Sequence, residues 1–188
     1  MIVPLSTAGI KDAIETLGFL KSNINLASQE IVKQLVEVGY ETASQINTEA
    51  PQSGLTKSQV IKGVTENKTK GYVALTGPSA VYDEFGTGEE GAADPHPMKN
   101  NTSRPLNPYN SGPFVSTHIN SKGEHYWFYS PMAGKNKYYK PETGYSTGIP
   151  SGKQIYNAAK EVRARKNGIT KKNLNASIKA FNTHKFNG

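Results

Sequence analysis

The sequence predicts an α+β fold, in which a long N-terminal amphipathic helix and C-terminal helices pack on a small, mainly antiparallel sheet with a long inserted loop region. Three observations lead to this prediction. Apolar residues recur at helical spacing before residue 50 and again after residue 153, and β-prone runs lie between these segments. From about Gly86 to Pro113 the chain is polar and lacks any period. Helices and strands are grouped rather than alternating, which argues against βαβ units.

The N-terminal helical signal has two parts. Thr7 is a candidate N-cap before Ile10, Ile14 and Leu17, which share one face. A second, longer pattern runs from about Asn25 to Glu49 and contains an apolar stripe formed by Ile31, Leu35, Val38 and Ile46. Pro51 cannot continue a helix, so the segment Pro51-Gln52-Ser53-Gly54 is predicted as a turn.

Strands are predicted at 60–64, 71–77, 80–82 and 125–129, because these runs are β-prone and bounded by turn residues. Helical spacing returns at Ile155, Ala159 and Val162, is interrupted near Gly168, and restarts after Thr170. We expect one domain over residues 1–188, with 88–148 as a long insertion and 167–188 as a basic C-terminal extension. The hydrophobic share of 35% predicts a modest core that neighbouring subunits support.

Composition excludes several classes of site. The chain has no cysteine, so it has no disulfide, thiolate nucleophile or cysteine zinc site. It has no run of about 18 apolar residues, which argues against a transmembrane helix. Its first residues lack the pattern of a secretory signal peptide.

Positive charge is concentrated at the C-terminal end. Residues 151–188 hold nine Lys or Arg and one acid, whereas residues 1–150 hold 13 basic and 14 acidic residues. Such a segment favours an anionic partner, which could be nucleic acid, anionic lipid or an acidic protein surface, although a solvated helical face is an equal alternative. The candidate contact residues are Lys153, Lys160, Arg163, Arg165, Lys166, Lys171 and Lys172.

The stretch V-Y-D-E-F-G-T-G-E-E-G, residues 81–91, contains the letters G-x-G-x-x-G. A dinucleotide loop is excluded because Glu89 and Glu90 would repel phosphate and no helical pattern follows. Asp83 and Glu84, if in a strand, point to opposite faces and cannot readily pair for acid–base catalysis. We expect one to face solvent and the other to accept hydrogen bonds from the Gly-Thr-Gly turn. The predicted structural corner consists of Tyr82, Glu84, Phe85, Gly86, Thr87 and Gly88, and Gly86 is expected to need φ > 0.

Other candidate sites are weaker. The spacing of His96, His118 and His125 fits no metal-binding motif, so no metal and no cofactor are predicted. The aromatic run 126–129 could stack on nucleic-acid bases, but packing in a core or an interface is favoured. No catalytic residue is assigned.

These features together resemble the minor virion proteins of tailed bacteriophages that complete the tail at the head–tail junction, known as tail-completion or neck proteins. The residues that carry the resemblance are Ala50-Pro51 followed by Ser53-Gly54-Leu55, then Tyr82-x-Glu84-Phe85-Gly86-Thr87-Gly88, and then Gly148-Ile149-Pro150-Ser151-Gly152 before Asn157-Ala158-Ala159. The resemblance covers roughly residues 26–166. The spacing from Ala-Pro to Gly is one residue shorter than the family pattern, and the 88–148 insertion is long.

The resemblance implies a structural virion protein and not an enzyme. It implies self-assembly into a cyclic, hexameric ring around the DNA passage, with tail-terminator and head-closing or connector proteins as partners, a place in the virion neck and assembly in the host bacterial cytoplasm. It implies no membrane partner. Two other functions remain open: a DNA-binding module that uses residues 151–188, and a hydrolase with Glu84 as its acid.

Overall fold

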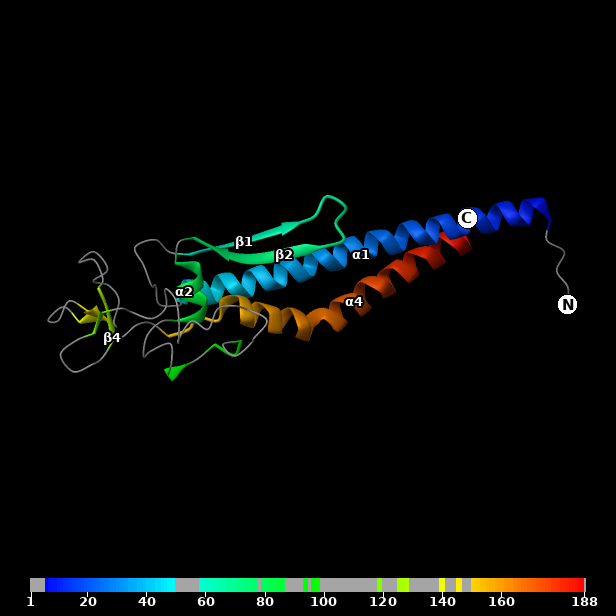
Figure 1. Ribbon diagram of the computed structural model, residues 1–188. Helices are drawn as coiled ribbons and strands as arrows, with labels where there is room; N and C mark the ends of the chain where they lie inside the picture. The colour runs from blue at the N-terminus through cyan, green and yellow to red at the C-terminus, as the bar shows by residue number, and fades with distance from the viewer. Residues whose placement is uncertain are drawn as a thin grey trace. The chain divides into compact units, whose positions relative to one another are not determined.

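The computed structural model describes residues 6–49, 58–77, 79–86, 93–94, 96–98, 118–119, 125–128, 139–140, 145–146 and 150–187. The fold is α+β, as predicted: a long N-terminal helix, a small antiparallel sheet and a C-terminal helix (Figure 1). The contacts of the chain divide it into two compact units. Unit 1 comprises Met1–Val38, Gly63–Tyr72 and Val162–Gly188, and unit 2 comprises Gly39–Lys62 and Val73–Glu161.

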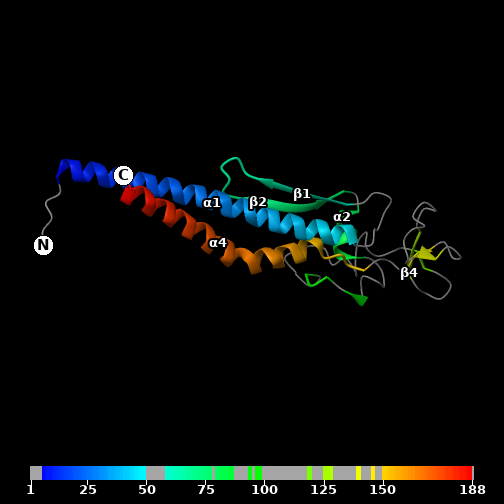
Figure 2. The same cartoon turned by 180° about the vertical axis from the view of Figure 1, so that it is seen from behind.

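The N-terminal element is a single helix, α1, Thr7–Glu49, 43 residues long (Figure 2). The predicted long N-terminal helix is therefore confirmed, and the two parts of its apolar pattern lie on one helix, because no residue between Leu17 and Asn25 interrupts helical geometry. The predicted cap was displaced by one residue. Ser6, rather than Thr7, accepts the Gly9 N–H on its Oγ at 3.1 Å, and its carbonyl accepts the Ile10 N–H at 3.0 Å.

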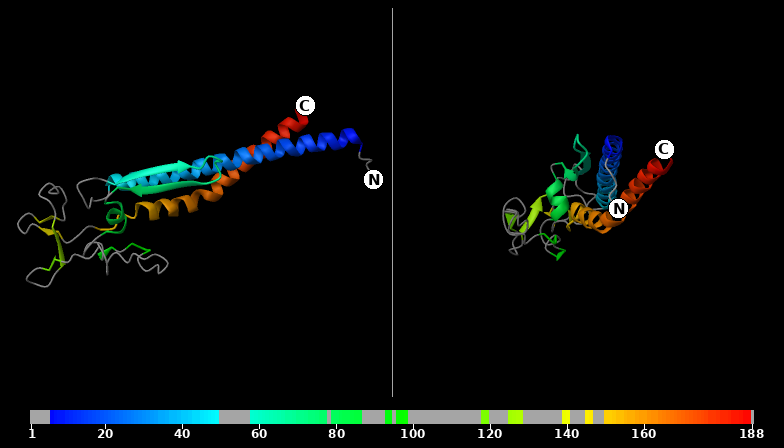
Figure 3. Two further views of the ribbon diagram at one scale, coloured as in Figure 1. Left: turned by 45° about the horizontal axis from the view of Figure 1, so that its top comes forward. Right: turned by 90° about the vertical axis from the view of Figure 1, so that its right-hand side faces the viewer.

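Two of the predicted strands form a hairpin (Figure 3). Strand β1, Gln59–Val64, pairs with β2, Gly71–Thr76, and the turn between them is closed by Thr65 N–H donating to the Lys70 carbonyl at 2.9 Å. A second sheet has the order β3-β4-β6-β5 and is antiparallel at each pairing. Its strands are β3, His118–Ile119; β4, His125–Phe128; β5, Tyr139–Lys140; and β6, Tyr145–Ser146.

The predicted strand at 80–82 is instead the short helix α2, Ala80–Phe85. Its first turn is closed by backbone bonds: Ala80 N–H donates to the Gly77 carbonyl, and Asp83 N–H donates to the Ser79 carbonyl. Gly77 has φ 120, a conformation that favours glycine and turns the chain out of β2. The β-prone letters Ala-Val-Tyr were therefore overridden by the turn chemistry of Gly77-Pro78-Ser79.

The C-terminal element is one continuous helix, α4, Gln154–Asn187. The predicted interruption near Gly168 does not occur. A glycine inside a helix costs about 1 kcal/mol relative to alanine, but it does not by itself end the helix. The predicted extension 167–188 is accordingly helical as far as Asn187.

The buried residues differ between the two units. Among the described residues, the buried apolar side chains are Ala27 and Val36 in unit 1, and Ala43 and Ala158 in unit 2. The buried polar side chains described are Ser58, Ser79, Asp83, Glu84, His96, Ser151 and Gln154, all in unit 2. The small set of buried apolar residues agrees with the hydrophobic share of 35%. The buried polar residues gather in unit 2, and the candidate functional site is described there.

Candidate functional site

Within unit 2, the end of α2 meets the beginning of α4 through the backbone. Gly152 N–H donates to the Asp83 carbonyl at 2.9 Å, and Lys153 N–H donates to the Glu84 carbonyl at 3.1 Å. The last carbonyls of a helix and the first N–H groups of a helix both lack partners inside their own helices. Here two of the last carbonyls of α2 accept hydrogen bonds from the N–H groups of the two residues that precede α4. We call this junction, with the side chains of Asp83, Glu84 and His96, the Glu84 corner.

The Glu84 carboxylate caps α4. Its Oε2 accepts the Ile155 N–H at 2.9 Å, and its Oε1 accepts the Tyr156 N–H at 3.0 Å. Both N–H groups lie in the first turn of α4, where the helix dipole also favours a negative charge. Glu84 is 7% exposed, so these charge-assisted hydrogen bonds are largely shielded from water.

His96 gives Glu84 a third hydrogen bond. The His96 Nε2 lies 3.0 Å from Glu84 Oε1, and the Met98 N–H donates to His96 Nδ1 at 3.0 Å. Since Nδ1 accepts a hydrogen bond, Nε2 carries the hydrogen that is donated to Glu84. The ring is 2% exposed and is held between Phe85, at a centroid distance of 4.4 Å, and Tyr156, at 5.4 Å.

Asp83 occupies a separate buried hydrogen-bond network. Its Oδ2 accepts the hydroxyls of Ser58 and of Ser79, the latter at 3.0 Å, and the two hydroxyl oxygens are 3.2 Å apart. Asp83 is 2% exposed. This network ties α2 to the residue that precedes β1, so the same short helix is fixed at two points.

The last turns of α1 also contact this network. Asn47 Nδ2 donates to the Ser58 carbonyl at 2.8 Å, and Gln154 Nε2 lies 3.4 Å from Asn47 Oδ1. Gln154, the first residue of α4, is fully buried. The part of α1 in unit 2 is thus connected to both β1 and α4 by polar side chains.

The prediction that one acid faces solvent was wrong: both Asp83 and Glu84 are buried. They lie on a helix rather than a strand, and each carboxylate has its own partners. Within the described residues, the partners of Glu84 are the start of α4 and His96, whereas two residues of the predicted Gly-Thr-Gly partner, Thr87 and Gly88, lie outside them.

Backbone conformation explains two residues of the corner. Gly86 follows α2 with φ 77 and ψ 175, a region open essentially only to glycine, so the predicted need for φ > 0 is confirmed. A Cβ on Gly152 would lie 2.6 Å from the Asp83 carbonyl oxygen, so only glycine fits there without movement. Lys153 has φ 55, which is uncommon outside glycine. Its side chain forms an ion pair with Asp94.

The other predicted corner residues have different outcomes. Tyr82 and Phe85 are half-buried on α2, where the Tyr82 carbonyl accepts the Gly86 N–H at 2.7 Å. Thr87 and Gly88 lie outside the described residues, as do the predicted turn at 51–54 and the side chains of the aromatic run 126–129.

The geometry of the corner suits a structural role for Glu84. In its three hydrogen bonds Glu84 accepts from groups of the chain itself, and both of its carboxyl oxygens are used in holding these groups in place. Within the described part of the chain, no group of three or more His, Asp or Glu residues could hold a metal ion. No described helix is both long and apolar enough to cross a membrane.

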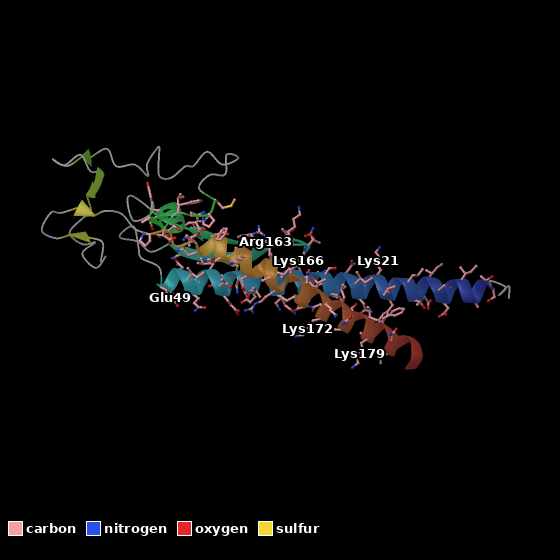
Figure 4. The ribbon with its side chains drawn as sticks, turned by 90° about the horizontal axis from the view of Figure 1, so that it is seen from below. Lys21, Glu49, Arg163, Lys166, Lys172 and Lys179 are labelled. Carbon is pink, nitrogen blue, oxygen red and sulfur yellow. The ribbon has the colours of Figure 1, made fainter. Side chains whose placement is uncertain are left out.

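The predicted contact residues do not form one cluster. Lys153 belongs to the corner, through its ion pair with Asp94. Lys160 is exposed on the part of α4 in unit 2. In unit 1, α4 carries a further set of exposed basic residues: Arg163, Arg165, Lys166, Lys171, Lys172 and Lys179. Figure 4 shows the side chains of Lys172 and Lys179 pointing away from α1.

Sequence reasoning missed several corner residues, namely Asn47, Ser58, Ser79, His96 and Gly152. His96 is separated from Glu84 by 12 positions and Gly152 by 68, so no local spacing links them. One signal was available: Pro150-Ser151-Gly152 precedes a helix whose own N-cap position, Lys153, carries no capping side chain. A helix without a local cap needs an acceptor from elsewhere in the chain.

Comparison of the chain with protein-family models, with curated proteins and with solved structures gave no match.

Proposed function

We propose that this protein is a structural virion component of the tailed-bacteriophage head–tail junction. In this role it completes the tail end as a ring of copies around the DNA passage and mediates head–tail joining. Its partners are then other copies of itself in a cyclic, hexameric ring, together with the tail-terminator and head-closing proteins on either side, and no membrane is among them. Such a protein is assembled in the host bacterial cytoplasm and resides in the neck of the virion.

One observation carries the proposal. Two of the three sequence pieces that resemble neck proteins are joined directly to each other in unit 2. Glu84, from Glu84-Phe85-Gly86-Thr87, caps the helix that follows Gly148-Ile149-Pro150-Ser151-Gly152. Residues of a motif with a structural role should hold one another in place, and these residues do so.

The surface of unit 1 gives independent support for assembly. Its helices expose large apolar side chains, among them Ile14 at 64%, Leu17 at 63% and Ile178 at 53%. A chain with few buried apolar residues and several exposed ones gains stability when neighbouring copies cover them. The exposed basic residues of α4 would then dock on an acidic neighbouring ring. They would not line the passage, because dense positive charge there would retain DNA instead of letting it pass.

The test is assembly of the full chain, alone and with isolated phage tails that lack this component. Mass photometry and electron microscopy should show closed rings, and the chain should bind tail ends and restore joining to filled heads. A chain that remains monomeric and never joins tails would remove the proposal. The matched control is Glu84→Gln, which alters the corner and should reduce joining in proportion to the loss of folded protein.

A second candidate, a DNA-binding module, rests on the exposed basic residues of α4. Helix α4 carries eight Lys or Arg and one acid, Glu161. Exposed cations spaced along a helix bind the phosphate backbone, and such binding weakens steeply with salt. The double substitution Lys171→Gln with Lys172→Gln should lower affinity for duplex DNA and reduce the salt slope by about 2. Lys21→Gln with Lys33→Gln on α1 is the matched control. Absence of duplex binding at low salt would exclude this function.

A further inference from the structure

An apolar row lies exposed along the N-terminal part of α1. Ile10, Ile14, Leu17 and Ile24 are 44%, 64%, 63% and 44% exposed. All four lie in unit 1, on residues that the structure describes. Removing side chains of this size from water is favourable, so a row of four exposed ones is a strong signal for a partner surface.

The spacing of the row identifies the kind of partner. Steps of four and three residues lead from Ile10 through Ile14, Leu17, position 21, Ile24, position 28, Ile31 and Leu35 to Val38. Every position that would be called d in a heptad is apolar, namely Ile10, Leu17, Ile24, Ile31 and Val38. A 3.5-residue period held over four heptads is the pattern of a coiled-coil seam, whose side chains pack between those of another helix with the same period. We call this row the α1 seam.

Elements of unit 1 occupy the faces of α1 beside the seam. On one side, α4 contacts α1 through Phe19, whose ring lies 6.2 Å from that of Phe181, and through Gln34, which accepts a hydrogen bond from Asn173 at 3.2 Å. On the other side, the start of β2 packs closely on α1, since a Cβ on Gly71 would lie 2.2 Å from Val36 Cγ2. The N-terminal end of the seam is left uncovered between these two contacts.

Charge favours a second α1 as the helix that covers the seam. From Thr7 to Ile24, α1 carries Lys11 and Lys21 against Asp12 and Glu15, so two copies of this segment have no net repulsion. By contrast, two copies of the strongly basic α4 would repel each other. An anionic surface such as DNA is also a poor match, because the row from Ile10 to Ile24 contains one cation, Lys21, and is otherwise apolar. Lys21 and Ser28 are the polar residues at a positions, and isolated polar residues there are compatible with a coiled coil and restrict its register.

We propose that the exposed part of the α1 seam binds the same part of the α1 helix of a second copy of this chain, so that the two helices pack as a coiled coil over residues 10–24. At 1.5 Å per residue the contact is about 21 Å long. This contact joins two copies as a pair and is separate from the contacts that would close a ring, so it rests on the proposed function only in that both require self-association.

The experiment measures self-association of the full chain by sedimentation velocity over a range of concentrations. The wild type should exceed its chain mass of 20.4 kDa as concentration rises. Leu17→Asp and Ile14→Asp each place a charge in the seam and should weaken association at least about tenfold. The matched control is Leu26→Asp, since Leu26 is 60% exposed on the same helix. It lies nine positions from Leu17, about half a turn around the helix. It should leave association unchanged within about twofold.

Each outcome decides the matter. A wild type that stays at the chain mass at all concentrations, or a Leu26→Asp effect equal to that of Leu17→Asp, overturns the seam. Far-UV circular dichroism of the variants checks that α1 remains helical. If association depends on the seam but the chain never joins tails, the inference stands and the phage function fails. If rings form and join tails with Leu17→Asp unaffected, the function stands and the seam fails.

Discussion

The Glu84 corner in unit 2 buries ionisable side chains, whereas the α1 seam in unit 1 exposes apolar ones, which is the reverse of the usual distribution between interior and surface. In the corner, two carboxylates and a histidine are nearly inaccessible to water, with exposures of 2–7%. In the seam, isoleucine and leucine are 44–64% exposed. Buried charges are tolerated because every one of them accepts or donates hydrogen bonds within the chain. Exposed apolar side chains carry no comparable compensation inside the chain. The carboxylates and the histidine of the corner therefore find their partners within the chain, whereas the α1 seam is the surface to which we propose that another copy binds.

The largest effect on stability is expected for Glu84→Ala. Removing the carboxylate leaves the Ile155 and Tyr156 N–H groups and the His96 Nε2 without their acceptor. We expect a loss of about 3–5 kcal/mol in the free energy of unfolding, measured by urea titration with circular dichroism. Glu84→Gln should cost about 1.5–3 kcal/mol, because hydrogen bonds to a charged group are replaced by weaker ones. The control Glu66→Gln lies in the exposed hairpin turn and should be neutral. If Glu84→Gln abolished an activity without loss of stability, the hydrolase alternative would gain support.

The next largest effect on stability is expected for a substitution at Gly86, where the chain leaves the corner. Gly86→Val places a β-branched side chain at φ 77 and ψ 175, which should cost about 3 kcal/mol. The same change at Gly168, where an added Cβ meets nothing within 4 Å inside α4, should alter stability by less than about 0.5 kcal/mol. Thermal unfolding of the two variants side by side measures the difference. Equal midpoints would show that the conformation of Gly86 is not required.

A smaller effect is expected for Gly152→Ala. The new Cβ would approach the Asp83 carbonyl oxygen to 2.6 Å and separate the ends of α2 and α4, at a cost of about 1–3 kcal/mol. Gly18→Ala on α1, where no atom lies within 4 Å of the added Cβ, should instead stabilise the helix by about 0.5–1 kcal/mol. Urea midpoints of the two alanine variants should therefore move in opposite directions. A shift in the same direction would mean that the α2–α4 junction is looser than its hydrogen bonds indicate.

The smallest expected effect is in the seam when copies are kept apart. At concentrations where the chain is dissociated, Leu17→Ser should change the free energy of unfolding by less than about 0.5 kcal/mol, because Leu17 is 63% exposed. The same variant should lower the stability measured at high concentration, where association adds to it. Unfolding curves at two concentrations test both statements. A large loss at low concentration would mean that Leu17 is needed within a single copy.

Local patterns predicted the elements better than their ends or their contacts. The strands at 59–64 and 71–76 and the helical character of both termini followed from period and propensity. The strand predicted at 80–82 was wrong because a turn at Gly77 and Ser79 outweighed the propensity of three residues. The two parts of the apolar pattern before residue 50 lie on the one long helix that was predicted.

The candidate site was predicted as a structural corner but not in its composition. Gly86 could be recognised from its setting, since its requirement is local. His96 and Gly152 could not, because their positions beside Glu84 depend on how distant segments return. The exposure of Ile10, Ile14 and Leu17 also could not be read from the sequence, where a stripe of apolar residues looks the same whether its partner is in the chain or in another copy.

The junction between α2 and α4 has a consequence for protein engineering. The chain departs after Gly86 and returns at Gly152, and the two sides are fastened within 3 Å of each other by the bond from Gly152 N–H to the Asp83 carbonyl. A segment whose two ends are already held together can change in length at little cost, since loop-closure entropy grows only with the logarithm of length. Beyond Met98, which is still needed to orient His96, this part of the chain is therefore a natural position for grafting a reporter domain or a binding peptide.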